Sequence, residues 1–189
     1  MKAIILKIVY ILYRVWFYVV FRLKSNIEFE SPSLKNCNKK LKREILRAFW
    51  ISAGLELEQD NYVSTDVKII CPKRLQMGIG SKVLSRCILD AREGISIGSD
   101  SYIGFGTVIL TKTRAKSLDR NGKPIYSKSN ANCTIIGDNC FIGANCMLLP
   151  GVEVKSNSVL GVSTLVLSNK TISGTVAGIP AKPIGNKSV

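Results

Sequence analysis

An aliphatic residue returns at every sixth position through most of the second half of this chain, over residues 97–109 and again over residues 136–172. The ten positions are Ile97, Ile103, Ile109, Ile136, Ile142, Leu148, Val154, Leu160, Val166 and Ile172. Glycine often follows the aliphatic residue, and the fourth residue after it is usually small. This spacing predicts short strands joined by tight corners.

Three six-residue sides make a triangular coil of eighteen residues, so residues eighteen apart are expected to stack. The predicted stacks are Ile136 on Val154 on Ile172, Ile142 on Leu160, and Leu148 on Val166. The core is therefore predicted to consist of aliphatic ladders inside a parallel β-helix. Cys140 and Cys146 fall at small inward positions, where we expect them to fill the core.

The repeat has two irregular stretches. Upstream it continues weakly through residues 79–83 and then loses register at Ser85 and Ala91, which predicts about four coils. Residues 115–135 are polar and contain Asn-Gly and Lys-Pro pairs, so they predict a loop that leaves the coil. A loop of this length within a compact repeat is more often functional than idle.

The N-terminus carries an apolar run over residues 3–21 that is interrupted by Lys7 and Arg14. These two lie on one helical face, which favours an amphipathic helix over residues 1–27 that lies on an anionic membrane surface, with a membrane span as the alternative. No cleavage site for a signal peptide follows. Residues 28–74 are expected to form a helical and linker segment with a helix over 38–52, and residues 75–189 the β-helix.

Composition excludes several kinds of chemistry. The 189 residues include no histidine, which removes Ser/His/Asp and Cys/His triads and histidine metal sites. Six cysteines without a CxxC pair indicate reduced thiols in a cytoplasmic protein and no metal.

The net charge is +14, and residues 1–50 hold 11 Lys/Arg against 3 Asp/Glu. No nucleic-acid recognition motif accompanies these charges, so no nucleic-acid partner is expected.

Four segments carry a family resemblance: residues 88–95, 97–111, 136–152 and 177–182. Together they resemble the hexapeptide-repeat acyltransferases, in particular bacterial O-acetyltransferases of sugars and surface polysaccharides. The resemblance implies a mainly β fold, a left-handed parallel β-helix with N-terminal α-helices. It also implies a homotrimer with acyl-CoA bound between neighbouring prisms.

The resemblance places Arg114 where the family has a histidine that accepts the proton of the acceptor hydroxyl. Lys112 stands where a second histidine often occurs, and Asp90 matches a family acid near the acceptor. Arginine stays protonated and cannot be a base. The candidates for the proton acceptor are therefore Lys112, Asp90 and, in the loop, Asp119. Alternatively, Lys112 and Arg114 bind an anionic ligand.

The resemblance assigns the acyl-CoA contacts more completely. It implies that a backbone amide at Gly143 and Ala144 faces the thioester, that Val162 and Ser163 lie along the pantetheine arm, and that Lys182 meets the nucleotide phosphates. Acetyl-CoA is thus the expected acyl donor.

Two hypotheses follow. The first is an acyl-CoA-dependent O-acetyltransferase on the inner face of the cytoplasmic membrane, acting on a glycan, a nucleotide sugar or a lipid-linked precursor. The second is a catalytically lapsed β-helix that binds a glycan, an acyl-CoA or a partner subunit.

Overall fold

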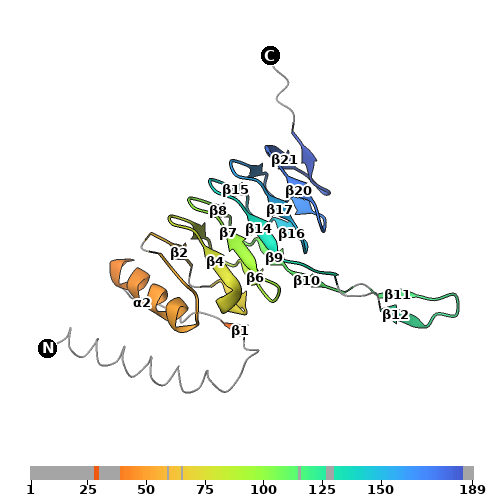
Figure 1. Cartoon of the computed structure of the whole chain (residues 1–189), viewed down its shortest axis with the longest axis horizontal. Helices are drawn as coiled ribbons and strands as arrows, with labels where there is room; N and C mark the ends of the chain where they lie inside the picture. The colour runs from red at the N-terminus through yellow and green to blue at the C-terminus, as the bar shows by residue number, and fades with distance from the viewer. Residues whose placement is uncertain are drawn as a thin grey trace, which may run out of the picture.

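The computed structural model describes residues 28–29, 39–58, 60–64, 66–114, 116–126 and 130–184. The predicted amphipathic helix of residues 1–27 lies outside these ranges. The described chain is mainly β, and its short strands stack into a three-sided coil with parallel neighbours, as the six-residue repeat predicted (Figure 1).

Each turn of the coil contributes one strand to each of three faces. Face 1 consists of β2 (Tyr62–Val63), β5 (Lys82–Val83), β8 (Tyr102–Ile103), β15 (Phe141–Ile142), β18 (Val159–Leu160), β21 (Thr175–Ala177) and the antiparallel β22 (Lys182–Pro183). Face 2 consists of the antiparallel β1 (Glu28–Phe29), then β3 (Lys68–Ile70), β6 (Ile88–Asp90), β9 (Val108–Leu110), β16 (Met147–Leu148) and β19 (Leu165–Val166). Face 3 consists of β4 (Leu75–Met77), β7 (Ile95–Ile97), β14 (Thr134–Ile136), β17 (Glu153–Val154) and β20 (Thr171–Ile172).

The predicted ladders are confirmed. Ile136 pairs with Val154 and Val154 with Ile172, while Ile142 pairs with Leu160 and Leu148 with Val166. All seven side chains are buried in one hydrophobic core.

The coil is longer at its N-terminal end than the sequence predicted. Face 3 has five strands, hence about five turns instead of four, and the first turn begins at β2, upstream of the expected boundary at residue 75. In the early turns, eight residues separate the buried face-2 position from the buried face-3 position, as from Leu89 to Ile97, where the later turns have six, as from Leu148 to Val154. These two additional residues between face 2 and face 3 shift the six-residue register, which is why Ser85 and Ala91 appeared to break it.

A helix covers the N-terminal end of the coil. Helix α2 (Lys39–Ser52), predicted over 38–52, lies beside the first strands of the coil (Figure 1). Its Phe49 and Trp50 pack into the same core as the first turns. Gly54, with φ +93°, ends the helix, and the amide of Leu55 donates to the carbonyl of Trp50 at 3.0 Å. None of the described helices is long and apolar enough to cross a membrane.

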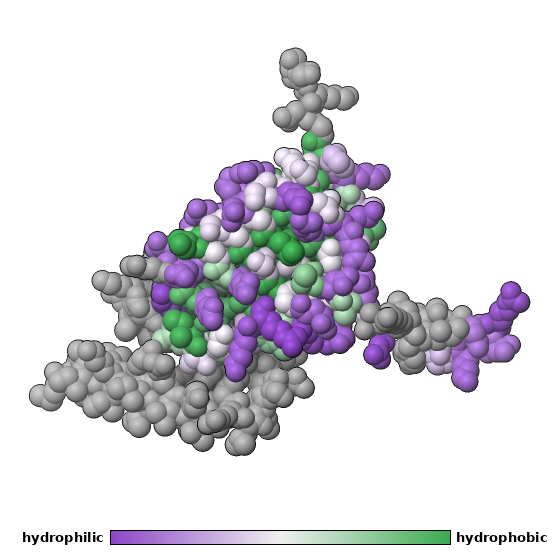
Figure 2. Space-filling model, in the orientation of Figure 1, coloured by the Kyte–Doolittle hydropathy of each residue, from purple (hydrophilic) through white to green (hydrophobic). Residues whose placement is uncertain are grey.

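An arm leaves the coil between β9 and β14, where residues 115–135 were expected to form a loop. Two antiparallel pairs build it, β10 (Lys112–Thr113) with β13 (Asn130–Ala131) and β11 (Lys116–Leu118) with β12 (Pro124–Tyr126). Figure 1 shows β11 and β12 standing well away from the coil. The described tip of the arm is hydrophilic in Figure 2.

Three cysteines point into the core, as predicted for Cys140 and Cys146, and each thiol donates to a carbonyl oxygen at 3.1 Å. Desolvation raises the pKa of Cys87 from 9.0 to about 11. The neutral Cys87 thiol therefore stabilises the fold fully below pH 9, and this contribution is lost as the pH rises toward 11.

We expect a thiol reagent at pH 8 to modify the exposed Cys133 readily and to leave Cys87, Cys140 and Cys146 unmodified until the chain unfolds. Peptide mapping by mass spectrometry checks this order. Between pH 9 and 11 the free energy of unfolding should fall by up to about 2–3 kcal/mol, and less in a Cys87→Ala variant. Rapid labelling of the three inward thiols in the folded protein would contradict the burial of these positions.

Candidate functional site

The candidate catalytic residues lie where face 2 turns into face 3, an edge we call edge 2–3. Asp90 ends β6 and is 1% exposed. Arg92 holds its carboxylate by two side-chain hydrogen bonds, from Nε at 2.8 Å and from Nη2 at 2.6 Å. These bonds raise the pKa of Arg92. Asp90 is thus occupied as a fixed ion-pair partner.

Lys112 opens the arm on the same edge. Its Nζ lies 3.4 Å from Oε1 of Glu93, and its backbone pairs with Ala131. The buried Thr111 hydroxyl donates to the Asp90 carbonyl at 2.6 Å and accepts from the Glu93 amide at 3.0 Å. The candidate lysine therefore lies beside the carboxylate of a residue whose backbone is hydrogen-bonded to the coil.

Arg114 follows β10 and is exposed, and it makes no ion pair with any described residue. Asp119 lies in the arm's turn, where its Oδ1 accepts from the amides of Asn121 at 2.9 Å and Lys123 at 2.8 Å. Asp119 therefore caps the turn between β11 and β12, the pair of strands that stands well away from the coil in Figure 1.

The residues assigned to acyl-CoA lie on a different edge, edge 1–2, where face 1 turns into face 2. A column of glycines allows successive turns to approach closely here. A Cβ on Gly104 would lie 2.6 Å from the Gly143 carbonyl carbon and 2.7 Å from the Ala144 nitrogen. A Cβ on Gly143 would lie 2.8 Å from the backbone of Gly161 and Val162.

The Ala144 peptide is fixed at this corner. Its carbonyl accepts from the Ser163 amide at 2.8 Å, while its own amide donates to no described residue. Such an amide, held on a rigid edge, is suited to stabilise negative charge on a ligand oxygen.

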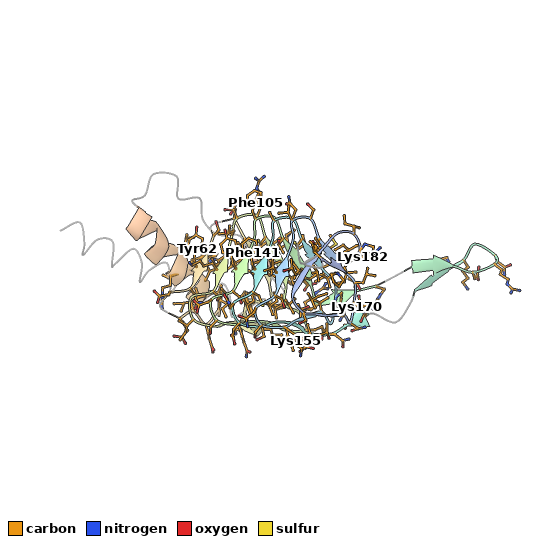
Figure 3. All side chains as sticks on the ribbon, turned by 90° about the horizontal axis from the view of Figure 1, so that it is seen from above. Tyr62, Phe105, Phe141, Lys155, Lys170 and Lys182 are labelled. Atoms are coloured by element: carbon orange, nitrogen blue, oxygen red, sulfur yellow. The ribbon has the colours of Figure 1, made fainter. Side chains whose placement is uncertain are left out.

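Val162 and Lys182 continue edge 1–2 toward the C-terminal end. Val162 is 64% exposed, and Ser163 adopts a left-handed corner conformation with φ +57°. Lys182 lies in β22, beside the last turn of face 1, and its side chain is exposed; Figure 3 labels it at the C-terminal end. The apolar Val162 and the cationic Lys182 thus lie in order along the edge.

One chain does not bring the two groups together, because Asp90, Lys112 and Arg114 occupy edge 2–3 and Ala144 occupies edge 1–2. Sequence reasoning missed the ion partners Arg92 and Glu93. It also missed Arg86, which lies on edge 1–2 in the stretch where the register appeared lost. No group of His, Cys, Asp or Glu within the described ranges could hold a metal ion.

Comparison with known proteins agrees with this fold. Residues 133–162 match the model of the hexapeptide repeat of succinyl-transferase. The Bacillus subtilis protein named "Putative acetyltransferase YvoF" is 34% identical over 95 residues, 50% of this chain and 49% of that protein. This chain thus spans about half of that relative's length.

Two solved structures share the architecture. A maltose O-acetyltransferase from Clostridium difficile superposes with a TM-score of 0.62 and 19% identity, covering 91% of this chain and 83% of that one. The hexapeptide-repeat acetyltransferase VCA0836 from Vibrio cholerae gives 0.61 and 19%, covering 78% and 80%. VCA0836 was also solved with acetyl coenzyme A, at a TM-score of 0.54 and 16% identity, covering 80% and 91%.

These matches confirm the resemblance to hexapeptide-repeat acyltransferases and the expected fold class, a mainly β, left-handed parallel β-helix.

Proposed function

We propose that this protein is an acyl-CoA-dependent O-acetyltransferase of a sugar or surface-polysaccharide precursor, with the donor bound along edge 1–2. The Ala144 amide carries the proposal, because it is fixed on the glycine-lined corner and has no acceptor among the described residues. The exposed Val162 and Lys182 give the pantetheine arm and the nucleotide phosphates an apolar and a cationic contact. The acetyl-CoA complex of VCA0836 supports the choice of donor.

In this reaction, an acceptor hydroxyl oxygen attacks the thioester carbon, the carbon–sulfur bond breaks, and coenzyme A leaves with a proton on sulfur. Negative charge develops on the thioester oxygen, and the Ala144 amide is placed to donate to it. Holding the two substrates together supplies a further part of the rate.

The step that this site supports least is removal of the hydroxyl proton. Asp90 is bound by Arg92, Lys112 lies against Glu93, and Arg114 stays protonated. A missing general base typically costs 10²- to 10⁴-fold in rate, so we expect slow transfer. This same observation favours the second candidate function, a β-helix that binds acyl-CoA or a glycan without turning it over.

Release of coenzyme A thiol, followed with acetyl-CoA and a panel of sugars, distinguishes the two functions. Slow release that depends on the sugar supports the enzyme. Binding of acetyl-CoA without such release supports the binding scaffold.

We also propose a homotrimer, because face 2 lies between the two edges that hold the site. If three copies turn face 2 toward a common axis, edge 1–2 of one copy approaches edge 2–3 of the next. The outer row of face 2 suits such packing, since Ile88, Val108, Met147 and Leu165 follow one another on neighbouring strands. Ile88 is 37% exposed and Met147 is 40% exposed.

Met147→Glu should therefore convert the trimer to monomers, because it places three carboxylates near the axis. Ile135→Glu is the matched control, since Ile135 is 44% exposed but lies on face 3. Sedimentation of the full chain at micromolar concentration measures both. A wild-type monomer, or a trimer that withstands Met147→Glu, would contradict this assembly.

Residues 1–27 lie outside the described ranges, and we propose that they hold the protein peripherally on the inner face of the cytoplasmic membrane. The sequence pattern of a basic stripe on an apolar run supports this placement.

A further inference from the structure

Edge 1–2 carries an arginine that the proposed donor does not use. The guanidinium carbon of Arg86 lies 4.1 Å from the centre of the Phe105 ring, a cation–π contact that restricts its position. Arg86 is exposed and Phe105 is half-buried. Figure 3 shows Phe105 on the opposite side of the coil from Lys155.

The backbone fixes where this pair lies relative to Ala144. The Asn145 amide donates to the Phe105 carbonyl at 2.7 Å, and the Gly106 amide donates to the Ser85 carbonyl at 2.9 Å. Phe105 is therefore one turn from Ala144 and Arg86 two turns, or about 5 and 10 Å at the usual strand spacing.

The pair lies on the side of Ala144 that is free for an acceptor. The donor as proposed extends from Ala144 toward Val162 and Lys182, in the C-terminal direction. The acceptor must then reach the thioester from the N-terminal direction, where Phe105 and Arg86 stand. Its remaining groups would pass over this pair.

Arg86 makes no ion pair or hydrogen bond with any described residue. The nearest acid on the edge is Asp66, one turn earlier, and its Oδ1 lies 3.2 Å from the Ser64 hydroxyl. The Arg86 guanidinium is directed the other way, over Phe105. A planar guanidinium held on a ring and free of a carboxylate is suited to bind a phosphate or carboxylate.

From this geometry we infer that the acceptor is anionic, and that Arg86, positioned by Phe105, binds its phosphate or carboxylate. This inference rests on the proposed function. Arg114 supports an anionic acceptor as well, because it is exposed and lies on edge 2–3, which approaches edge 1–2 of the next copy in the proposed trimer. Neutral sugars offer no group that would use these charges.

The test compares matched sugars on the full chain in the presence of coenzyme A. Binding of glucose, glucose 1-phosphate and glucuronic acid is measured by ligand-observed NMR, and acetyl transfer from acetyl-CoA to each sugar is followed in a separate assay. We expect one or both anionic sugars to bind at least about 10-fold more tightly than glucose, the strength of a charge-assisted hydrogen bond. Comparison of glucose 1-phosphate with glucuronic acid shows whether Arg86 binds a phosphate or a carboxylate.

Variants separate recognition by Arg86 from a general effect of positive charge. Arg86→Gln should reduce the preference for the anionic sugar to about 2-fold or less, whereas Arg86→Lys and Phe105→Leu should leave an intermediate preference. Lys82→Gln removes the same charge from face 1 and should change nothing. Acetyl-CoA affinity should stay constant in all four variants, because they lie outside the donor contacts.

The outcomes distinguish this inference from the proposed function. If acetyl-CoA does not bind to the wild-type protein, the proposed function fails and the inference loses its basis. If acetyl-CoA binds but neither anionic sugar is preferred over glucose, the inference alone is wrong. A preference that persists in Arg86→Gln, or that Lys82→Gln reduces equally, also overturns the assignment to Arg86.

Discussion

Replacing Arg114 with histidine is expected to raise acetyl transfer by about 10²-fold, because it supplies the general base that the site lacks. Arg114 is exposed and has no described partner, so the substitution removes no contact that holds the fold together. Single-turnover transfer from acetyl-CoA to the best acceptor measures the change, with donor affinity determined alongside.

Thr113→His is the matched control, since it places an imidazole one residue earlier, on β10. It should leave the rate near the wild-type value. Lys112→Ala and Asp90→Asn test the alternative bases directly. If either of these abolishes transfer while Arg114→His has no effect, a native base exists on edge 2–3 and our account of slow transfer is wrong.

Gly104→Ala is expected to weaken both the fold and the binding of acetyl-CoA. The added Cβ would lie 2.6 Å from the Ile142 carbonyl oxygen and 2.7 Å from the Ala144 nitrogen, so backbone must move. Overpacking of this kind costs about 1–3 kcal/mol, or roughly 3–10 °C in melting temperature. Because the displaced peptide is the proposed oxyanion donor, acetyl-CoA affinity should fall by at least about 10-fold.

Gly122→Ala provides the comparison. Gly122 lies in the arm's turn with φ +78° and has no atom within 4 Å of its Cβ position. The backbone strain should lower the free energy of unfolding by about 1 kcal/mol and leave the affinity for acetyl-CoA unchanged. Calorimetry measures the acetyl-CoA affinity of both variants, on protein that circular dichroism shows to be folded. Equal losses of affinity in the two variants would contradict the donor site on edge 1–2.

The sequence predicted the regular part of the fold well because a ladder repeats one packing requirement in every turn. The later turns, in which each face takes six residues, were predicted from positions such as Ile136, Ile142 and Leu148. The early turns were hidden because two more residues lie between the face-2 and face-3 strands there, so that Leu89 and Ile97 are eight residues apart. A search for a six-residue period does not detect this longer spacing.

The site could be predicted only in part. The family motifs indicated Ala144 and Arg114 as site residues, which stay predictions, but the motifs do not say that these two residues lie on different edges of the coil. Ion pairs such as that of Asp90 with Arg92 depend on the side-chain rotamers at a corner of the coil, so the six-residue repeat does not predict them. The cation–π contact of Arg86 with Phe105 joins two turns that are twenty residues apart in this stretch, beyond the eighteen-residue repeat.

Calorimetric titration of acetyl-CoA into the wild-type chain is the decisive measurement for the proposed donor site. We expect saturable binding of one acetyl-CoA per chain, displaced by coenzyme A and independent of any sugar. The absence of binding at millimolar acetyl-CoA, in protein shown to be folded and trimeric, would contradict it.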